Sequence, residues 1–334
     1  MDKYALIARN TQEIISENEL KTLLIEKESP VVYIGTAITG RPHMGYYMWV
    51  RKVADFLNAG LTVKVLLADI HGMLENTSVD VLEKRYEYYV IAVQGMLQSF
   101  GVALDKLQFV KGSDFQLTPK YTKDLLRLST LVSIHDAQKA GSEVVKQHDS
   151  PKLGGLMYPL MQCLDEEYLG VDIQYGGMDQ RKILVLAREV LPKLGYKARI
   201  EIMTPIIPGL IGKKMSASDG KSKIDLLDDT DSVKSKMKKA DFVQGDTDNG
   251  IMGITQYVLF PWLEDTQQKF VIERPEKFGG DVFYSSYEEL EQAVLKNEVH
   301  PLDVKNTVAK YVSELLEKIP GKELLQELSS SFEV

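Results

Sequence analysis

Short apolar runs and longer amphipathic stretches alternate along the first two thirds of the chain. The apolar runs predict strands at residues 31–35, 62–69, 107–111, 171–177 and 198–204. Between these runs, apolar positions at helical spacing predict helices at residues 43–59, 79–100, 117–132, 136–147, 154–169 and 179–195. This alternation is typical of crossover units, which build a parallel sheet covered by helices. We therefore predict an α/β fold with a doubly wound parallel sheet.

The pattern changes near residue 231, where strand-like runs stop and helical periods take over. Apolar residues then recur at helical spacing, for example at Val304, Val308, Tyr311 and Leu315. The change follows a polar stretch at residues 216–223. We predict three segments, namely an α/β domain over residues 1–212, a loop and linker over 213–230, and a smaller all-α domain over 231–334.

The composition fits a soluble protein with a packed core and narrows the class of function. The chain has 334 residues, of which 44% are hydrophobic and 26% charged. Its net charge of −8 argues against a general nucleic-acid coat protein, although a local basic stripe can still bind RNA. No apolar run is long enough to span a bilayer, and the acidic, polar start is unlike a secretory signal.

Cysteine and histidine usage favours a reducing compartment and argues against a structural metal. The single cysteine, Cys163, excludes an internal disulfide, so we expect a cytoplasmic protein. Five scattered histidines without any cysteine pair predict no tightly bound protein metal.

A glycine turn follows the first predicted strand and leads into a helix. Gly35 and Gly40 have the spacing of a P-loop, but Arg41 and Pro42 stand where a P-loop needs Lys and Ser or Thr. What remains is a turn whose amides, together with the helix N-terminus, favour phosphate oxygens. His43 at that N-terminus can donate to the charge that develops on an α-phosphate, or it can simply cap the helix.

The predicted helix at residues 154–169 carries a polar stripe within an otherwise apolar sequence. Tyr158, Gln162 and Asp165 fall at i, i+4 and i+7 and therefore share one face. Such a stripe is either a buried polar network or the wall of a binding site. Cys163 lies off this face, which favours a core position over a nucleophile.

The fourth predicted strand ends in a second glycine turn, at Gly177, followed by Asp179 and Gln180. We expect the first and fourth strands to adjoin where the strand order reverses, which is where open parallel sheets bind ligands. Tyr33 and Gly35 lie at the matching end of the first strand. Asp179 is well placed to bind ribose hydroxyls.

These strings together resemble the tyrosyl-tRNA synthetases of the archaeal and eukaryotic type. The likeness is carried by YIGTAITGRPHMGYY, LLADIHGML, YPLMQCLDEEYLGVDIQYGGMDQRK and KKMSASDGKSKIDLLD, and it extends to RPEKFGGD and HPLD near the C-terminus. HMGY and KMSAS are similar to the HIGH and KMSKS motifs of class I synthetases. The resemblance implies a Rossmann-like catalytic domain followed by an all-α anticodon-binding domain.

The resemblance also implies roles for individual residues. Tyr33 and Asp165 match residues that hold the phenolic hydroxyl of tyrosine. The rest of the amino-acid site is matched by Gly35, Tyr158, Gln162 and Gln180. The ATP site is matched by His43, Gly45, Gly177, Asp179, Lys214 and Met215. The catalytic group is His43 together with Lys214, Ser216 and Ser218 of the loop over the pyrophosphate.

Three further matches concern tRNA. Phe278 and Asp303 match residues that read the first anticodon base, and Arg181 matches a contact with the first acceptor-stem pair. A run of lysines comprises Lys234, Lys236, Lys238 and Lys239. It forms either a solvated helix face or a contact with the RNA backbone.

The chain departs from the family pattern at two motif positions. Tyr46 stands at the second histidine of the first motif, and Ala217 stands at the second lysine of the loop motif. Transition-state charge must then rest on Lys214, on Mg²⁺, or on other lysines of the loop, which are Lys213, Lys221 and Lys223.

The resemblance implies a ligase that activates L-tyrosine with ATP and Mg²⁺ and transfers it to the terminal ribose of tRNA(Tyr), with release of AMP and diphosphate. Neither step needs a protein nucleophile, so catalysis is positioning plus stabilisation of charge. Family members act as homodimers. The alternatives are a tryptophanyl-tRNA synthetase and a non-catalytic tRNA-binding relative.

Overall fold

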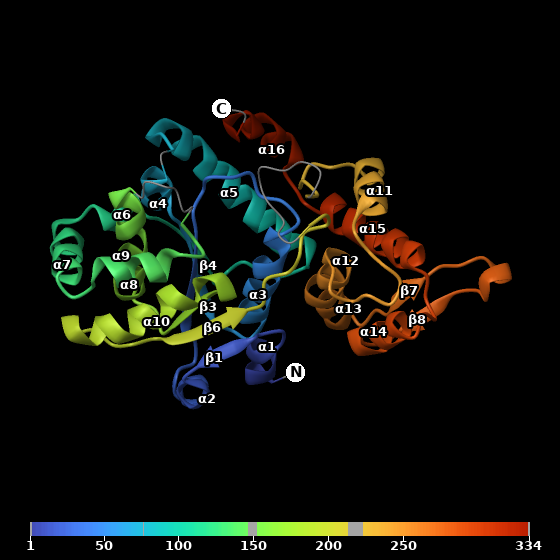
Figure 1. Ribbon diagram of the computed structural model, residues 1–334, viewed down its shortest axis with the longest axis horizontal. Coiled ribbons are helices and arrows are strands. Elements are labelled where there is room, and N and C mark those ends of the chain that lie inside the picture. The colour runs from blue at the N-terminus through green and yellow to red at the C-terminus, as the bar shows by residue number, and fades with distance from the viewer. Residues whose placement is uncertain (1, 76, 146–151, 213–222, 333–334) are drawn as a thin grey trace.

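The computed structural model describes residues 2–75, 77–145, 152–212 and 223–332. Its main feature is a six-stranded sheet with the strand order β1-β6-β5-β2-β3-β4 (Figure 1). The strands are β1 (Glu13–Ile15), β2 (Val31–Thr36), β3 (Thr62–Leu67), β4 (Leu107–Lys111), β5 (Ile173–Gly177) and β6 (Ile200–Thr204). All neighbours pair in parallel except β1, which runs antiparallel to β6. The parallel sheet predicted from the sequence is confirmed, and β1 is an additional edge strand.

Both faces of this sheet are buried, which explains why its strands are nearly continuous apolar runs. On β2 and β3, Val32, Ile34 and Val65 join the large core cluster on one face. Tyr33 and Leu66 alternate with them and pack in a smaller cluster on the other face. The alternation places Tyr33 on the side of the sheet where the site described below is formed.

Helices cover both faces. The first face packs against α3 (Tyr46–Asn58) and α5 (Val79–Ser99), and the second face carries α9 (Leu153–Tyr168) and α10 (Arg181–Val190). The remaining helices of this part are α1 (Lys3–Ala8), α2 (Glu17–Glu26), α4 (Asp69–Leu74), α6 (Ser113–Gln116), α7 (Pro119–Ser129) and α8 (Ile134–Gly141). Two short 3₁₀ segments, η1 (Met178–Gln180) and η2 (Leu191–Leu194), flank α10. The doubly wound architecture is therefore present.

The C-terminal part is mostly helical but is not all-α. Its helices are α11 (Thr230–Lys239), α12 (Gly250–Ile254), α13 (Phe260–Asp265), α14 (Tyr287–Leu295), α15 (Pro301–Glu317) and α16 (Lys322–Leu328), with short segments η3 (Thr255–Leu259), η4 (Glu276–Phe278) and η5 (Ser329–Phe332). An antiparallel pair of strands, β7 (Phe270–Ile272) and β8 (Val282–Tyr284), lies between α13 and α14. The prediction that strands stop after residue 231 was wrong, because strands of three residues are too short to show a period.

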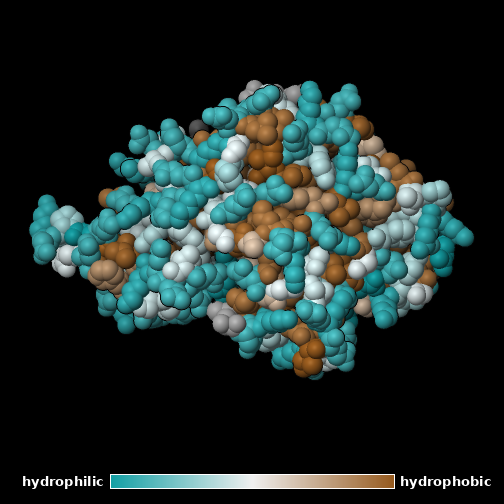
Figure 2. All heavy atoms as spheres, turned by 180° about the vertical axis from the view of Figure 1, so that it is seen from behind, coloured by the Kyte–Doolittle hydropathy of each residue, from teal (hydrophilic) through white to brown (hydrophobic). Residues whose placement is uncertain are grey.

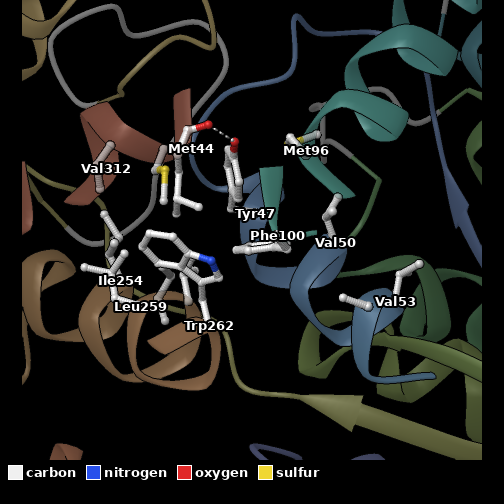
Figure 3. Packing of buried hydrophobic residues seen from close by; sticks show 14 of the residues in the cluster. Met44, Tyr47, Val50, Val53, Met96, Phe100, Ile254, Leu259, Trp262 and Val312 are labelled. Carbon is white, nitrogen blue, oxygen red and sulfur yellow. Dashed lines mark hydrogen bonds between the residues drawn. The ribbon is translucent and has the colours of Figure 1, made fainter. Parts of the chain in front are cut away.

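The apolar core runs without interruption from the sheet into the C-terminal helices. Tyr47 of α3 packs edge-on against Phe100 at 5.4 Å, and Trp262 of α13 lies in the same cluster with only 1% exposure (Figure 3). The Tyr47 hydroxyl also donates to the backbone carbonyl of Leu315 in α15, at 3.4 Å. A separate anticodon-binding domain is therefore not confirmed by the packing, and the boundaries proposed from the sequence stay predictions.

A buried ionic network reinforces this junction. Asp55 of α3 accepts from Arg9, from Arg51 at 2.8 Å and from Lys52 at 2.9 Å. Arg9 and Arg51 also pair with Asp265 at the end of α13. Removing one partner from such a buried network typically costs about 3–5 kcal/mol, because it leaves a charge without compensation.

The outer surface is largely polar. Figure 2 shows the side opposite to Figure 1, where hydrophilic side chains dominate the rim and apolar ones gather in patches towards the middle. Among the described residues, no helix is both long enough and apolar enough to cross a membrane.

Candidate active site

Two adjoining cavities open at the carboxyl ends of β2 and β5, where the strand order reverses. The large cavity has a volume of about 370 Å³ and lies between the ends of β2, β5 and β6 and the start of α3. The small cavity has a volume of about 150 Å³ and lies between β2, β3, α4 and α9. Both are lined by Gly35, Thr36, Gln162 and Gln180. Ligands in the two cavities would therefore touch each other across this shared wall.

Asp165 forms the polar end of the small cavity. It is fully buried, and its Oδ1 accepts hydrogen bonds from Gln116 Nε2 at 2.8 Å and from the Tyr121 hydroxyl at 2.9 Å. Its Oδ2 has no hydrogen-bond partner within the described part of the chain and lies 4.0 Å from His71 Nε2. Burial raises the pKa of Asp165 to about 7, although the two hydrogen bonds oppose that rise. One carboxylate oxygen is thus fixed, and the other is available to a ligand.

Tyr33 lines the same cavity from β2. It is fully buried, and its hydroxyl donates to the backbone carbonyl of Gln162 at 3.3 Å. Burial, together with the nearby charge of Asp165, raises the pKa of Tyr33 well above its ordinary value. Tyr33 therefore stays protonated and is a hydrogen-bond donor, whereas Asp165 is an acceptor. A ligand hydroxyl, which both donates and accepts, matches this pair.

His71 completes the small cavity in its neutral form. Burial lowers the pKa of His71 to about 4. Its Nδ1 is 3.5 Å from Gln116 Nε2, and its ring packs edge-on against Tyr158 at 4.5 Å. Sequence reasoning missed His71, Gln116 and Tyr121 as members of the site. His71 lies inside the conspicuous string LLADIHGML, whereas Gln116 and Tyr121 carry no local signal.

His43 stands at the entry of α3 in the large cavity. Its side-chain Nδ1 accepts from the backbone N–H of Gly45 at 3.1 Å, so in the neutral ring the proton is on Nε2. Burial is the main cause that lowers the pKa of His43 to about 4, and the charge of Lys223 adds to it. His43 is therefore a neutral donor at physiological pH. The N-cap of α3 is Gly45 and no side chain caps it, so His43 is a wall of the cavity and not a helix cap.

The second glycine turn closes the opposite wall of the large cavity. Gly177, Asp179 and Gln180 all line it, and Gln162 Nε2 donates to Gln180 Oε1 at 3.1 Å. A Cβ added at Gly177 would come within 2.7 Å of the Asp179 carboxylate, so only glycine leaves that carboxylate its position. Gly35 and Gly45 line the same space from the first turn.

The structure therefore brings most of the predicted site residues together. The small cavity collects Tyr33, Gly35, Tyr158, Gln162, Asp165 and Gln180, and the large one collects His43, Gly45, Gly177 and Asp179. The loop residues Lys214, Met215, Ser216 and Ser218, with Lys213, Ala217 and Lys221, lie outside the described residues. Cys163 is fully buried, and burial raises the pKa of its thiol well above the ordinary value, which agrees with a core position.

None of the predicted RNA contacts lines either of the two cavities. Arg181 is exposed at the start of α10, and its guanidinium forms a two-point ion pair with Glu13 at 2.6 and 2.9 Å. Phe278 ends η4, and Asp303 lies in the first turn of α15, both in the C-terminal part. Of the lysine run on α11, Lys236 is paired with Asp228 at 2.5 Å.

Tyr46, at the second histidine position of the first motif, is hydrogen-bonded through its hydroxyl to that of Tyr89 on α5 at 2.9 Å. Its ring lines the large cavity and packs edge-on against His43 at 5.3 Å.

The fold and the paired cavities place this chain among the open α/β proteins whose ligand site lies at the carboxyl ends of the strands, where the strand order reverses. A family model described as tRNA synthetases class I (W and Y) matches residues 26–317. The chain belongs to this family.

Relatives of known name agree closely over this chain. It is 49% identical over 324 residues to the cytoplasmic tyrosine–tRNA ligase of Danio rerio, which covers 96% of this chain and 60% of that protein. It is 48% identical over 327 residues to the cytoplasmic tyrosine–tRNA ligase of Saccharomyces cerevisiae, covering 95% of this chain and 83% of that protein. The chain thus spans about 60% of the length of the vertebrate relatives it matches.

Solved structures agree in fold. The tyrosyl-tRNA synthetase of Archaeoglobus fulgidus complexed with L-tyrosine has a TM-score of 0.89 and 39% identity, over 97% of this chain and 98% of that one. The tryptophanyl-tRNA synthetase of Aeropyrum pernix has a TM-score of 0.70 at 15% identity, covering 95% of this chain and 83% of that one. The second likeness concerns the fold alone.

Proposed function

We propose that the chain is a tyrosine–tRNA ligase that activates L-tyrosine with ATP and transfers it to the terminal ribose of tRNA(Tyr). The observation that carries this proposal is the small cavity, where a protonated Tyr33 and the free oxygen of Asp165 face one buried space. A phenolic hydroxyl satisfies both groups at once. The relatives named tyrosine–tRNA ligase support the same substrate.

The indole of tryptophan fits this pair less well. Its N–H can donate to Asp165, but it offers no acceptor that could take over the Tyr33 proton from the carbonyl of Gln162. Indole therefore forms one hydrogen bond to the pair, where a phenol can form two. Tryptophan is therefore disfavoured as the substrate, and the intact His43 and Asp179 disfavour a purely tRNA-binding role.

The shared wall places the two substrates for reaction. Gln162, Gln180 and Tyr158 orient the amino acid, so that its carboxylate points from the small cavity to the large one. That carboxylate attacks the α-phosphate of ATP, and pyrophosphate leaves. The Nε2–H of neutral His43 donates to the charge developing on the phosphate, while Asp179 holds the ribose. No protein nucleophile takes part, so the gain comes from positioning and from preorganised donors.

Magnesium and the loop lysines complete this scheme. Mg²⁺ usually binds through the phosphates of its nucleotide and keeps several waters, so we propose that it accompanies ATP. Among the described residues, no group of three or more His, Cys, Asp or Glu side chains is assembled as a metal site. We propose that Lys214, Ser216 and Ser218 stabilise the charge on the leaving pyrophosphate. Lys223, the described lysine nearest to them in the sequence, is a further candidate for this role.

The transfer step extends the proposal to the C-terminal part. Phe278 and Asp303 are proposed to meet the anticodon, and Arg181 the acceptor stem, after exchanging its contact with Glu13 for RNA. We propose a cytoplasmic homodimer, as in the family. Exposed apolar side chains at α6 to α8 support a partner surface there, and they are Leu117, Leu126, Leu131 and Ile134.

The test is amino-acid-dependent exchange of pyrophosphate into ATP, followed by charging of tRNA(Tyr). The expected result is exchange with tyrosine and a far lower kcat/KM for exchange with tryptophan or phenylalanine. Lys84→Ala replaces an exposed side chain on α5 and serves as the control, which should exchange like the wild-type protein. Exchange that is as efficient with tryptophan as with tyrosine, or tRNA binding without any exchange, would overturn the assignment.

A further inference from the structure

The C-terminal segment of the chain packs on the helix that supports the first glycine turn. From residue 319 onward the chain runs antiparallel along α5, since Ile319 meets Gly95 and Gly321 meets Ile91. The last described residues form η5, where the Phe332 ring packs edge-on against Tyr88 at 5.0 Å. Figure 1 shows α16 beside α5.

Arg85 of α5 connects this segment to the turn. Its Nε donates to the backbone carbonyl of Ser331 at 3.1 Å, and its Nη1 donates to the carbonyl of Thr39 at 2.6 Å. The guanidinium carbon lies 4.8 Å from the centre of the Phe332 ring, which places a cation over an aromatic face. Arg85 is only 6% exposed, so these contacts are shielded from water.

Tyr89, one turn further along α5, holds the same loop. Its hydroxyl donates to the carbonyl of Gly40, lies 3.5 Å from that of Ala37, and is hydrogen-bonded to Tyr46. Its ring centre is 6.3 Å from that of Phe332. Three carbonyls of residues 37–40 are therefore turned towards α5.

This arrangement fixes the direction of the amides in the turn. In a trans peptide the C=O and the next N–H point in opposite directions, and the described chain has no cis bond. Holding the carbonyls of residues 37, 39 and 40 against α5 turns the amides of residues 38, 40 and 41 away from it. Backbone N–H groups held in a fixed direction beside a nucleotide site are suited to donate to a phosphate. The turn lies between Gly35 and His43, which line the large cavity.

We propose that Arg85 and Tyr89 are positioning residues for the triphosphate of ATP, and that residues 329–332 hold them in place. The inference rests on the proposed function in that the nucleotide is ATP. The C-terminal segment then contributes to catalysis without touching a substrate. Removing the contact of Arg85 loosens the donors of the turn. The polar end of the small cavity, at Tyr33 and Asp165, stays in place, because Ala37 is the one residue among 37–40 that lines this cavity.

The experiment compares Arg85→Ala, Arg85→Lys, Tyr89→Phe and Phe332→Ala with the control Lys84→Ala on the solvent side of the same helix. Calorimetric titration gives the ATP and tyrosine dissociation constants, and pyrophosphate exchange gives the two KM values. We expect Arg85→Ala to weaken ATP about tenfold, the loss of one charge-assisted hydrogen bond, with tyrosine affinity within about twofold of wild type. Arg85→Lys should recover part of the loss, because the lysine ammonium keeps the charge and can donate to one of the two carbonyls.

Phe332→Ala should act in the same direction, and Lys84→Ala should change neither affinity. The proposal is overturned if Arg85→Ala and Tyr89→Phe leave ATP affinity unchanged, or if they weaken ATP and tyrosine equally. Wild-type protein that binds ATP but exchanges with no amino acid would refute the proposed function instead. The ATP titrations of the variants would still decide the role of Arg85.

Discussion

Replacing Asp165 by asparagine tests the small cavity most directly, because the change keeps the size of the side chain and removes its charge. Two donors, Gln116 and Tyr121, meet Oδ1. They will hold the amide oxygen of the introduced asparagine in that place and turn its NH₂ towards the ligand. The phenolic hydroxyl then loses its acceptor inside a dry pocket.

The expected loss follows from that exchange. A hydrogen bond to a charged group contributes about 1.5–3 kcal/mol, and a buried hydroxyl without an acceptor costs about 1–3 kcal/mol. A total of about 3 kcal/mol corresponds to a loss of about 10²-fold in kcat/KM for tyrosine. Phenylalanine makes no such bond and should lose nothing. Discrimination against phenylalanine, about 10⁵-fold for the tyrosyl-tRNA synthetases that are the reference example of this effect, should fall accordingly.

The pH profile gives this prediction a second and independent readout. With a pKa of about 7 in the empty pocket, Asp165 is only about one-tenth ionised at pH 6. Tyrosine affinity should therefore fall about tenfold between pH 8 and pH 6 in wild type. The neighbouring His43 and His71, with pKa values of about 4, stay neutral over this range and do not contribute. In Asp165→Asn the dependence should vanish.

Pyrophosphate exchange with tyrosine and phenylalanine, at several pH values, measures all of these quantities. Tyr168→Phe, which removes a hydroxyl bonded to Asp124 outside the cavity, is the matched control. An unchanged kcat/KM for tyrosine in Asp165→Asn, or a persistent fall in affinity below pH 7, would refute the assignment of the phenol site.

Three other outcomes are expected. His43→Ala should lower kcat for adenylate formation about 10²–10³-fold, as for other lost donors to developing charge, with an unchanged tyrosine dissociation constant measured by titration. Glu201→Gln should raise the melting temperature more at pH 8 than at pH 5, because burial raises the pKa of Glu201 and of Glu166. The stability that these two carboxyl groups contribute is present below their ordinary pKa and is lost as the pH rises through the raised values. Equal gains in melting temperature at both pH values would contradict this prediction. Lys238→Ala should reduce the slope of log affinity for tRNA(Tyr) against log salt by about one, and an unchanged slope would exclude this lysine from phosphate contact.

The sequence predicted those features whose signal is local. Tyr158, Gln162 and Asp165 recur at helical spacing, and that spacing alone places them on one face of α9. The neighbouring positions of β2 and β5 followed from the strand order of doubly wound sheets, and their parallel pairing confirms it.

Features that depend on contacts between distant segments could not be predicted. Gln116 reaches Asp165 across 49 residues, and Tyr121 reaches it across 44, with no pattern near either residue that marks the contact. The short strands β1, β7 and β8 carry three residues each, which is less than the roughly four to eight needed for a recognisable alternation. The role of Tyr46 was equally hidden, because its partner Tyr89 lies on another helix.

The continuity of the core gives α3 a double role that its sequence does not reveal. Its N-terminus presents His43 and Gly45 to the large cavity, and the ionic network around Asp55 anchors its other half to α1 and α13. A helix of 13 residues spans about 20 Å and is stiff over that length. The wall of the large cavity and the contact with α13 therefore lie at the two ends of one rigid element.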